Sequence, residues 1–160
     1  MRDENEFNKT ITEGIKRLGT SYRAIKASDR FHIGMPDWFI FHDGRTAAVE
    51  AKFVKEEKQK GAVLSYKMTG AQYSFMQKME LAGVPGWLLL GVKDVRRMFL
   101  IPAVEVIDGQ IYWEDFVHNP HWKGFYFHEV RDMVDWLFGG YNEHKGDENA
   151  FATARGDEYT

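Results

Sequence analysis

The sequence contains no cysteine among its 160 residues. This absence excludes disulfide bonds, thiolate zinc sites and cysteine nucleophiles. The chain also has no apolar run near the ~18 residues that a membrane-spanning helix needs. Its first six residues, Met-Arg-Asp-Glu-Asn-Glu, are too charged for a secretory signal. Together these absences favour a cytoplasmic protein without a membrane partner.

An excess of basic residues is missing as well. The chain has 24 Asp and Glu against 21 Lys and Arg, which gives a formal net charge of −3. Dedicated nucleic-acid-binding proteins usually carry a basic surface, so this balance argues mildly against that class. The charge is uneven, however, because acids gather near the N-terminus and after Gly140, whereas residues 52–67 hold five lysines and two glutamates. A local basic strip is compatible with the acidic total.

The composition predicts one compact domain, since 44% of the residues are apolar and 15% aromatic. Apolar residues at helical spacing predict helices over residues 4–18, 69–81 and 130–138. Short apolar runs between turn residues predict strands over residues 22–25, 38–41, 46–51, 87–92 and 98–101. This order of elements indicates a single α/β or α+β domain.

Two parts of the chain are expected to lie outside this regular structure. The polar residues 55–67 predict a mobile loop. Residues 139–160, which are rich in Gly, Asn, Asp and Glu, predict a flexible acidic tail. The folded domain is therefore expected to span residues 1–138.

Charged residues bracket the hairpin that is predicted for residues 38–51. Asp43-Gly44 is a favoured two-residue turn, so residues that face each other across the hairpin have numbers that sum to 87. Asp37 then lies opposite Glu50, with the two Cβ atoms about 4.5–5.5 Å apart. Side chains alternate along a strand, which places Lys52 on the same face as Glu50. Three charged groups are thus expected to converge on one side of an apolar hairpin.

This arrangement predicts a site for phosphodiester hydrolysis. Two opposed carboxylates repel each other, and hard oxygen ligands at this separation suit Mg²⁺ or Mn²⁺. The metal would act as a Lewis acid and water activator, with a lysine beside it to orient water or to stabilise developing charge. A simpler interpretation also exists, in which Pro36-Asp37 is only a turn and Glu50-Ala51-Lys52 is a solvated strand edge or an ion pair.

Pro36-Asp37, twelve intervening residues and then Glu50-Ala51-Lys52 resemble the signature of the PD-(D/E)xK nuclease superfamily. Over residues 3–102 the chain is most similar to the archaeal-type Holliday junction resolvases within it. The further matches are an acid in the first helix, a serine before the hairpin, an early glutamine in the next helix, a Gly-x-Pro turn, and a basic residue before a strand ending in Ile-Pro. In this sequence they are Glu4 or Glu6, Ser28, Gln72, Gly83-Val84-Pro85, Arg96 or Arg97, and Ile101-Pro102.

The resemblance implies a single restriction-endonuclease-like domain with a central mixed β-sheet flanked by helices. It implies a Mg²⁺-dependent endonuclease that acts as a homodimer and cuts two symmetric strands of a four-way DNA junction. Asp37 and Glu50 would bind the metal, together with the carbonyl of Ala51. Lys52 would be the catalytic lysine.

The family's helix acid has three candidates in this chain, Glu4, Glu6 and Glu13. At 100° per residue, Glu4 falls on the apolar stripe of its helix, whereas Glu6 and Glu13 fall on the opposite side. We therefore expect Glu4 to be the further metal ligand and catalytic acid. The alternative for Glu4 is an acid that is merely favourable in the first turn of a helix.

The residues expected to contact DNA surround this site. Lysines 55, 58 and 60 follow the strand that carries Lys52, Ser28 and Arg30 precede the hairpin, and Gln72 would support the lysine or the water. The alternatives are a solvated lysine loop and an exposed polar residue at position 72. Since phosphate contacts dominate DNA affinity, the acidic total weakens the case for junction selectivity more than the case for nuclease chemistry.

Two other functions remain open on sequence alone. The same site could serve a flap, repair or restriction-like nuclease, or the chain could be a non-catalytic DNA-binding module, although the intact Asp, Glu and Lys argue against the latter. Two further patterns are weak. His118 and His121 have a spacing that could bind a metal, but two histidines in a loop are not by themselves a metal site. The aromatic residues between 113 and 136 are expected to form core and part of a dimer face.

Overall fold

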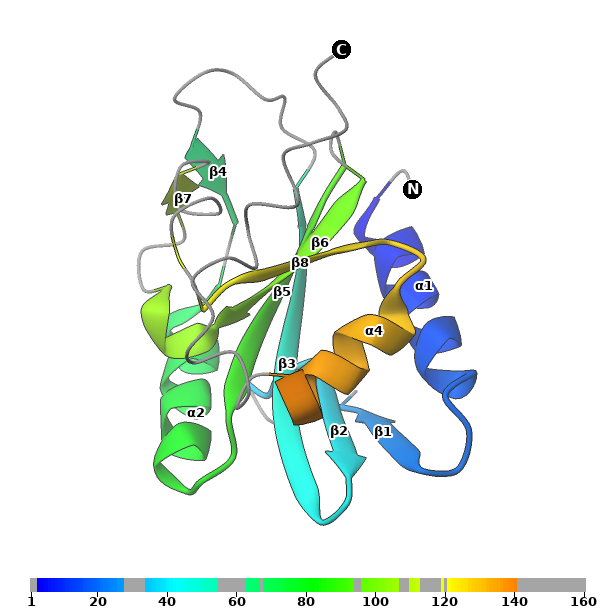
Figure 1. The fold of residues 1–160 in the computed structure, drawn as a ribbon. Coiled ribbons are helices and arrows are strands. Elements are labelled where there is room, and N and C mark those ends of the chain that lie inside the picture. Colours follow the sequence, from blue (N-terminus) through cyan, green and yellow to red (C-terminus); the bar gives the residue numbers. More distant parts are fainter. Residues whose placement is uncertain are drawn as a thin grey trace.

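The structure is a computed structural model that describes residues 3–27, 34–54, 63–66, 68–93, 96–106, 110–112, 119 and 121–140. A six-stranded sheet forms the centre of the molecule, in the order β1-β2-β3-β5-β6-β8 (Figure 1). Its strands are β1 (Tyr22–Lys26), β2 (Trp38–His42), β3 (Arg45–Val54), β5 (Gly86–Val92), β6 (Arg97–Pro102) and β8 (Lys123–Tyr126). β3 and β5 run parallel, and the other neighbours in this sheet are antiparallel. The predicted mixed sheet is confirmed.

Helices cover both faces of this sheet (Figure 1). The helices α1 (Glu4–Lys16) and α4 (Val130–Asp135), the latter continued by the π-helical turn η2 (Trp136–Gly140), share one hydrophobic core with the sheet. On the other face lie α2 (Gly70–Leu81) and the 3₁₀ turn η1 (Ala103–Glu105). No helix in the described part of the chain is long and apolar enough to cross a membrane.

The hairpin of β2 and β3 has the predicted register. Its pairs run from Trp38–Val49 to His42–Arg45. Both turn residues have positive φ, 48° at Asp43 and 70° at Gly44, as a two-residue turn of type I′ requires. Because this turn fixes the pairing, it also fixes which side chains of each strand share a face.

The side chains of β3 separate the two layers of the molecule. Ala47, Val49 and Ala51 join the core that contains Phe7 of α1. Ala48 points the other way and packs with Met76 of α2. By the same alternation, the even-numbered residues Glu50 and Lys52 face the α2 side of the sheet.

Three short strands were not predicted. β4 (Val63–Ser65) lies within the segment that we expected to be a loop, and it pairs with β7 (Gln110–Tyr112) in a separate two-stranded sheet. β8 pairs with β6. Strands of three or four residues are too short to show a period in the sequence, and their partners lie far along the chain. The remainder of the expected loop, residues 55–62 and 67, lies outside the described residues.

The C-terminal helical segment ends at Gly140, two residues later than predicted, because η2 continues α4. Residues 141–160 of the expected acidic tail lie outside the described residues. The expectation that aromatic residues of this region form core is confirmed for Trp122 and Phe125, which are both buried, and for Trp136, which packs against the core.

Candidate active site

Asp37 occupies the position just before β2, where its carboxylate and its backbone are both held. The N–H of Ala51 donates a hydrogen bond to Asp37 Oδ2 at 2.9 Å. The carbonyl of Asp37 accepts a hydrogen bond from the N–H of Ala27 at 2.9 Å. The pairing of β1 with β2 therefore continues one step beyond Lys26–Trp38, and the bond from Ala51 holds the Asp37 carboxylate beside the strand that carries Glu50.

Glu50 is the one charged side chain that is buried among the described residues, with 1% of its surface exposed. Its Oε1 accepts a hydrogen bond from Gln72 Nε2 at 2.5 Å and lies 2.6 Å from Lys52 Nζ. Its Oε2 is buried and has no hydrogen-bond partner among the described residues. Burying a carboxylate oxygen without a hydrogen-bond donor destabilises the folded state. A positively charged ligand beside Oε2 would offset this destabilisation.

The protonation of Glu50 reflects this environment. Burial raises the pKa of Glu50 from 4.5 to about 7, and the negative charge of Asp37 adds to the rise. The hydrogen bond and the charge of Lys52 oppose it. Carboxylates whose pKa is raised by burial and by a like charge are typical of functional sites.

Lys52 lies two residues beyond Glu50 on β3 and on the same face of the sheet. Its side chain is 18% exposed, and its ammonium contacts Glu50 at 2.6 Å. The positive charge thus sits at the rim of the carboxylate pair, where it is close enough to bond one ligand and still accessible from outside.

Gln72 connects this pair to the first turn of α2. Thr69 caps the helix: its hydroxyl accepts a hydrogen bond from the N–H of Gln72 at 3.2 Å, and its own N–H donates to Gln72 Oε1 at 2.9 Å. This reciprocal capping box leaves Gln72 Nε2 to donate to Glu50. The expected role of Gln72 was to support the lysine or the water, whereas the structure places it on the buried carboxylate.

The carbonyl of Ala51 opens toward the same side as the Asp37 carboxylate. In a strand the N–H and C=O of one residue point toward the same neighbour, and the N–H of Ala51 points to Asp37. The β2–β3 pairing ends at Trp38–Val49, so no residue of β2 pairs with Ala51. Two carboxylates and one carbonyl therefore border the same space.

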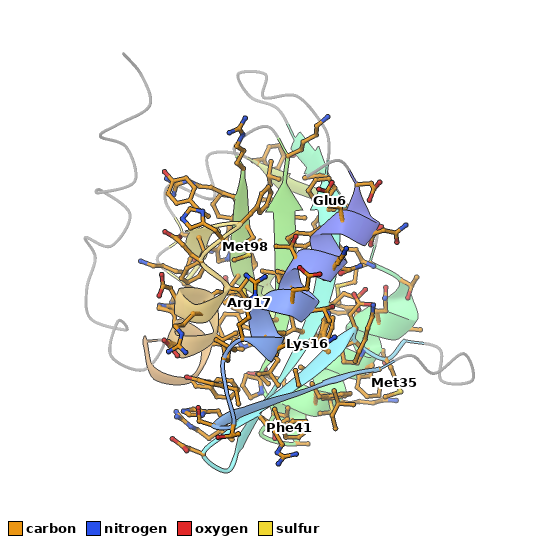
Figure 2. All side chains as sticks on the ribbon, turned by 90° about the vertical axis from the view of Figure 1, so that its right-hand side faces the viewer. Glu6, Lys16, Arg17, Met35, Phe41 and Met98 are labelled. Carbon is orange, nitrogen blue, oxygen red and sulfur yellow. The ribbon has the colours of Figure 1, made fainter. Side chains whose placement is uncertain are left out.

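The structure does not bring Glu4 to this site. Glu4 is exposed, and no group of three His, Asp or Glu side chains that could hold a metal occurs among the described residues. The helical wheel correctly predicted that Phe7, Ile11 and Ile15 form a buried stripe. Glu4 extends this stripe on the wheel, but its side chain is exposed. A helical wheel does not show which face of the sheet a helix covers, and α1 packs on the face of β3 opposite to Glu50. Figure 2 shows α1 in front of the sheet, with Glu6 near its N-terminal end.

Five residues that we expected to contact DNA, Ser28, Arg30, Lys55, Lys58 and Lys60, lie outside the described residues, and their roles stay predictions. His118 also lies outside them. His121 does have a carboxylate partner, Glu105, which is distant in the sequence. Glu105 accepts hydrogen bonds from Asn119, His121 and Trp122, so its oxygens are occupied by protein donors.

Comparison with known proteins supports the fold. No protein-family model and no curated protein sequence matches the chain. Among solved structures, the chain is similar to Hjc, a Holliday junction resolvase from the archaeal hyperthermophile Archaeoglobus fulgidus. The TM-score is 0.52 at 15% identity, over 79% of this chain and 98% of that chain. The bacterial homing endonuclease I-Ssp6803I matches with a TM-score of 0.43 at 15% identity, over 68% of this chain and 70% of that chain.

The similarity to the archaeal protein shows the class of fold. The mixed sheet, the flanking helices and the coverage of nearly the whole of that structure define a restriction-endonuclease-like fold. At this level of identity the likeness concerns the fold alone.

Proposed function

We propose that the protein is a divalent-metal-dependent DNA endonuclease whose active site contains Asp37, Glu50 and Lys52. The observation that carries this proposal is the buried Oε2 of Glu50, which has no hydrogen-bond partner in the described part of the chain and lies in a site whose other carboxylate is Asp37. A protein keeps such an arrangement at a cost in stability, and a bound cation offsets that cost. The restriction-endonuclease-like fold supports the same function.

The residues present fit a hard divalent cation. Asp37, Glu50 and the carbonyl of Ala51 offer only oxygen atoms, as Mg²⁺ prefers, and Mn²⁺ suits the same donors. A bound Mg²⁺ would supply Lewis-acid polarisation of a phosphate and would make a water more acidic. Because Mg²⁺ keeps several of its waters, three protein ligands are sufficient without Glu4.

The protein groups around the ligands have separate tasks in this proposal. Lys52 orients the attacking water or stabilises the negative charge that develops on the phosphate oxygens. Gln72 holds Glu50 so that Oε1 is bonded to the protein and Oε2 faces the ligand space. Because Glu50 is buried, the dielectric constant around it is low, and this strengthens each of these electrostatic interactions.

We further propose that the substrate is a four-way DNA junction and that the active form is a homodimer. The order of sequence features over residues 3–102 supports this assignment, as does the fold of the archaeal resolvase. A four-way junction presents two equivalent strands, and a symmetric dimer offers two equivalent sites to them.

The test is cleavage of a labelled synthetic four-way junction and of a linear duplex with the same arm sequences. We expect paired symmetric nicks in the junction alone, dependent on Mg²⁺ and abolished by EDTA. Asp37→Asn and Lys52→Ala should each lower the cleavage rate by at least about 10²-fold, while the matched surface variants Asp132→Asn and Lys16→Ala should cleave normally. Full activity in either site variant would refute the mechanism. Equal cleavage of both substrates would keep the nuclease and reject junction selectivity.

A further inference from the structure

We infer that Gly34 is a positioning residue that sets the spacing between the two carboxylates of the proposed metal site. The inference rests on the proposed function and assigns to that site a residue that makes no contact with its ligands. Gly34 begins the short segment 34–37, which leads from the α2 side of the molecule into β2.

Gly34 lies against the backbone of α2. A Cβ atom at this position would stand 2.6 Å from both the carbonyl carbon and the carbonyl oxygen of Ala71, and 3.0 Å from its Cβ. Two of these atoms are backbone atoms in the first turn of a helix, so they cannot rotate away. The φ angle of Gly34 is +97°, which L side chains rarely adopt. Only glycine lets the segment lie this close to α2.

This contact joins the two parts of the chain that carry or hold the ligands. Three residues after Gly34 comes Asp37, whose carboxylate accepts a hydrogen bond from Ala51. Directly after Ala71 comes Gln72, whose amide holds Glu50. The distance between the segment 34–37 and the first turn of α2 therefore bears on the distance between Asp37 and Glu50.

A Cβ at position 34 would disturb that spacing. Relief of a 2.6 Å contact to an ordinary van der Waals separation of 3.4 Å needs a shift of about 1 Å between the segment and the helix. Mg²⁺ and Mn²⁺ sites tolerate much smaller errors in ligand position. Gly34→Ala should thus affect metal binding beyond any general loss of stability.

The chain offers a matched control for the backbone strain. Gly83, just after α2, has a φ of +83°, and a Cβ there would meet nothing within 4 Å. Gly83→Ala therefore introduces comparable backbone strain without the clash. A residue with a merely structural role at position 34 should behave like this control.

The first experiment compares Mn²⁺ affinity and melting temperature in the wild type, Gly34→Ala and Gly83→Ala. We expect both variants to melt at lower temperature. Mn²⁺ binding should weaken by about tenfold or more in Gly34→Ala and stay within about twofold of the wild type in Gly83→Ala. Equal Mn²⁺ affinity in the two variants would overturn the inference.

A second measurement needs no metal. Hydrogen exchange at the N–H of Ala51 reports its bond to Asp37, and it should accelerate in Gly34→Ala but not in Gly83→Ala. If Gly34→Ala does not fold, Ala71→Val crowds the same contact from the helix and leaves the backbone at position 34 unstrained. Mn²⁺ affinity and Ala51 exchange should then change in the same directions, and wild-type values for both would overturn the inference.

The outcomes separate this inference from the proposed function. A wild-type protein that binds no Mn²⁺ would overturn the proposed function, and exchange at Ala51 would still decide whether Gly34 holds Asp37 in place. A wild-type protein that binds Mn²⁺, with binding lost in Asp37→Asn but unchanged in Gly34→Ala, would keep the site and overturn the role of Gly34.

Discussion

Glu50 is the residue on which most properties of the site depend. It is buried, one of its oxygens is bonded to Lys52 and Gln72, and the other has no partner among the described residues. Each contact has a consequence that can be measured separately, because protonation, metal binding and stability all depend on the same carboxyl group.

The raised pKa of Glu50 predicts how stability varies with pH in the absence of metal. The folded protein holds the Glu50 proton up to pH about 7, whereas the unfolded chain releases it near 4.5. Between these values the folded state binds more protons, so the free energy of unfolding falls as pH rises, by up to about 3 kcal/mol. Above pH 7 it should level off.

Urea denaturation in EDTA between pH 4.5 and 8 measures this dependence. Glu50→Gln, which cannot ionise, should flatten the profile and should stabilise the protein at pH 8 by about 2 kcal/mol. Saturating Mg²⁺ should raise the free energy of unfolding of the wild type at pH 8, because the cation binds the ionised carboxylate of the folded protein. Parallel profiles for the two proteins in EDTA would show that Glu50 is not the group responsible.

At the level of elements, the first turn of α2 is the part of the scaffold nearest to the chemistry. Thr69 caps the helix, and Gln72 of the same capping box holds Glu50. The first turn of α1 has an equivalent cap, in which Asp3 accepts a hydrogen bond from the N–H of Glu6 at 2.9 Å. That helix packs on the opposite face of β3.

The two caps give a matched pair of variants. Thr69→Ala and Asp3→Ala should each lower the free energy of unfolding by about 1 kcal/mol. Thr69→Ala alone should also weaken Mn²⁺ binding, because Gln72 loses part of its anchor. Urea denaturation and Mn²⁺ titration of both variants check this expectation. A similar change in Mn²⁺ affinity for both would mean that the capping box of α2 does not position Glu50.

How much of these elements the sequence predicts depends on how local their determinants are. The Asp43-Gly44 turn fixes the hairpin register by itself, and this is why the neighbourhood of Asp37, Glu50 and Lys52 could be predicted. The face of the sheet that α1 covers depends on packing with β3, which the pattern of the helix alone does not specify. For this reason the sequence predicted Glu4 as a ligand, whereas the structure leaves it exposed on a helix that covers the other face. The contact between Gly34 and Ala71 joins positions far apart in the chain, so no local sequence pattern predicts it.

For the molecule as a whole, the distribution of charge has a simple form. Residues 141–160 contain five acidic and two basic side chains, which equals the whole formal net charge of −3. Residues 1–140 therefore carry equal numbers of the two signs. The acidic total, which argued against DNA binding, thus belongs to the C-terminal residues and not to the part of the chain that holds the site.

The proposed homodimer predicts a particular behaviour of mixed subunits. Wild-type protein should sediment as a dimer, and mixtures with excess Asp37→Asn should form dimers with a single functional site. Such dimers should nick one strand of a four-way junction, since each site cuts its own strand. Analytical ultracentrifugation and denaturing gels of the cleaved junction provide the readouts. A monomer that makes paired cuts, or paired cuts from the mixed dimer, would be incompatible with the proposal.

Mn²⁺ binding at pH 8, followed by electron paramagnetic resonance, shows whether Asp37 and Glu50 form a divalent metal site. We expect one bound Mn²⁺ per chain, which Mg²⁺ displaces. The affinity should fall by about 100-fold or more in Glu50→Gln and Asp37→Asn, and it should be unchanged in Glu13→Gln, an exposed acid on the other side of the sheet. The same Mn²⁺ affinity in the wild type and in Glu50→Gln would contradict this assignment.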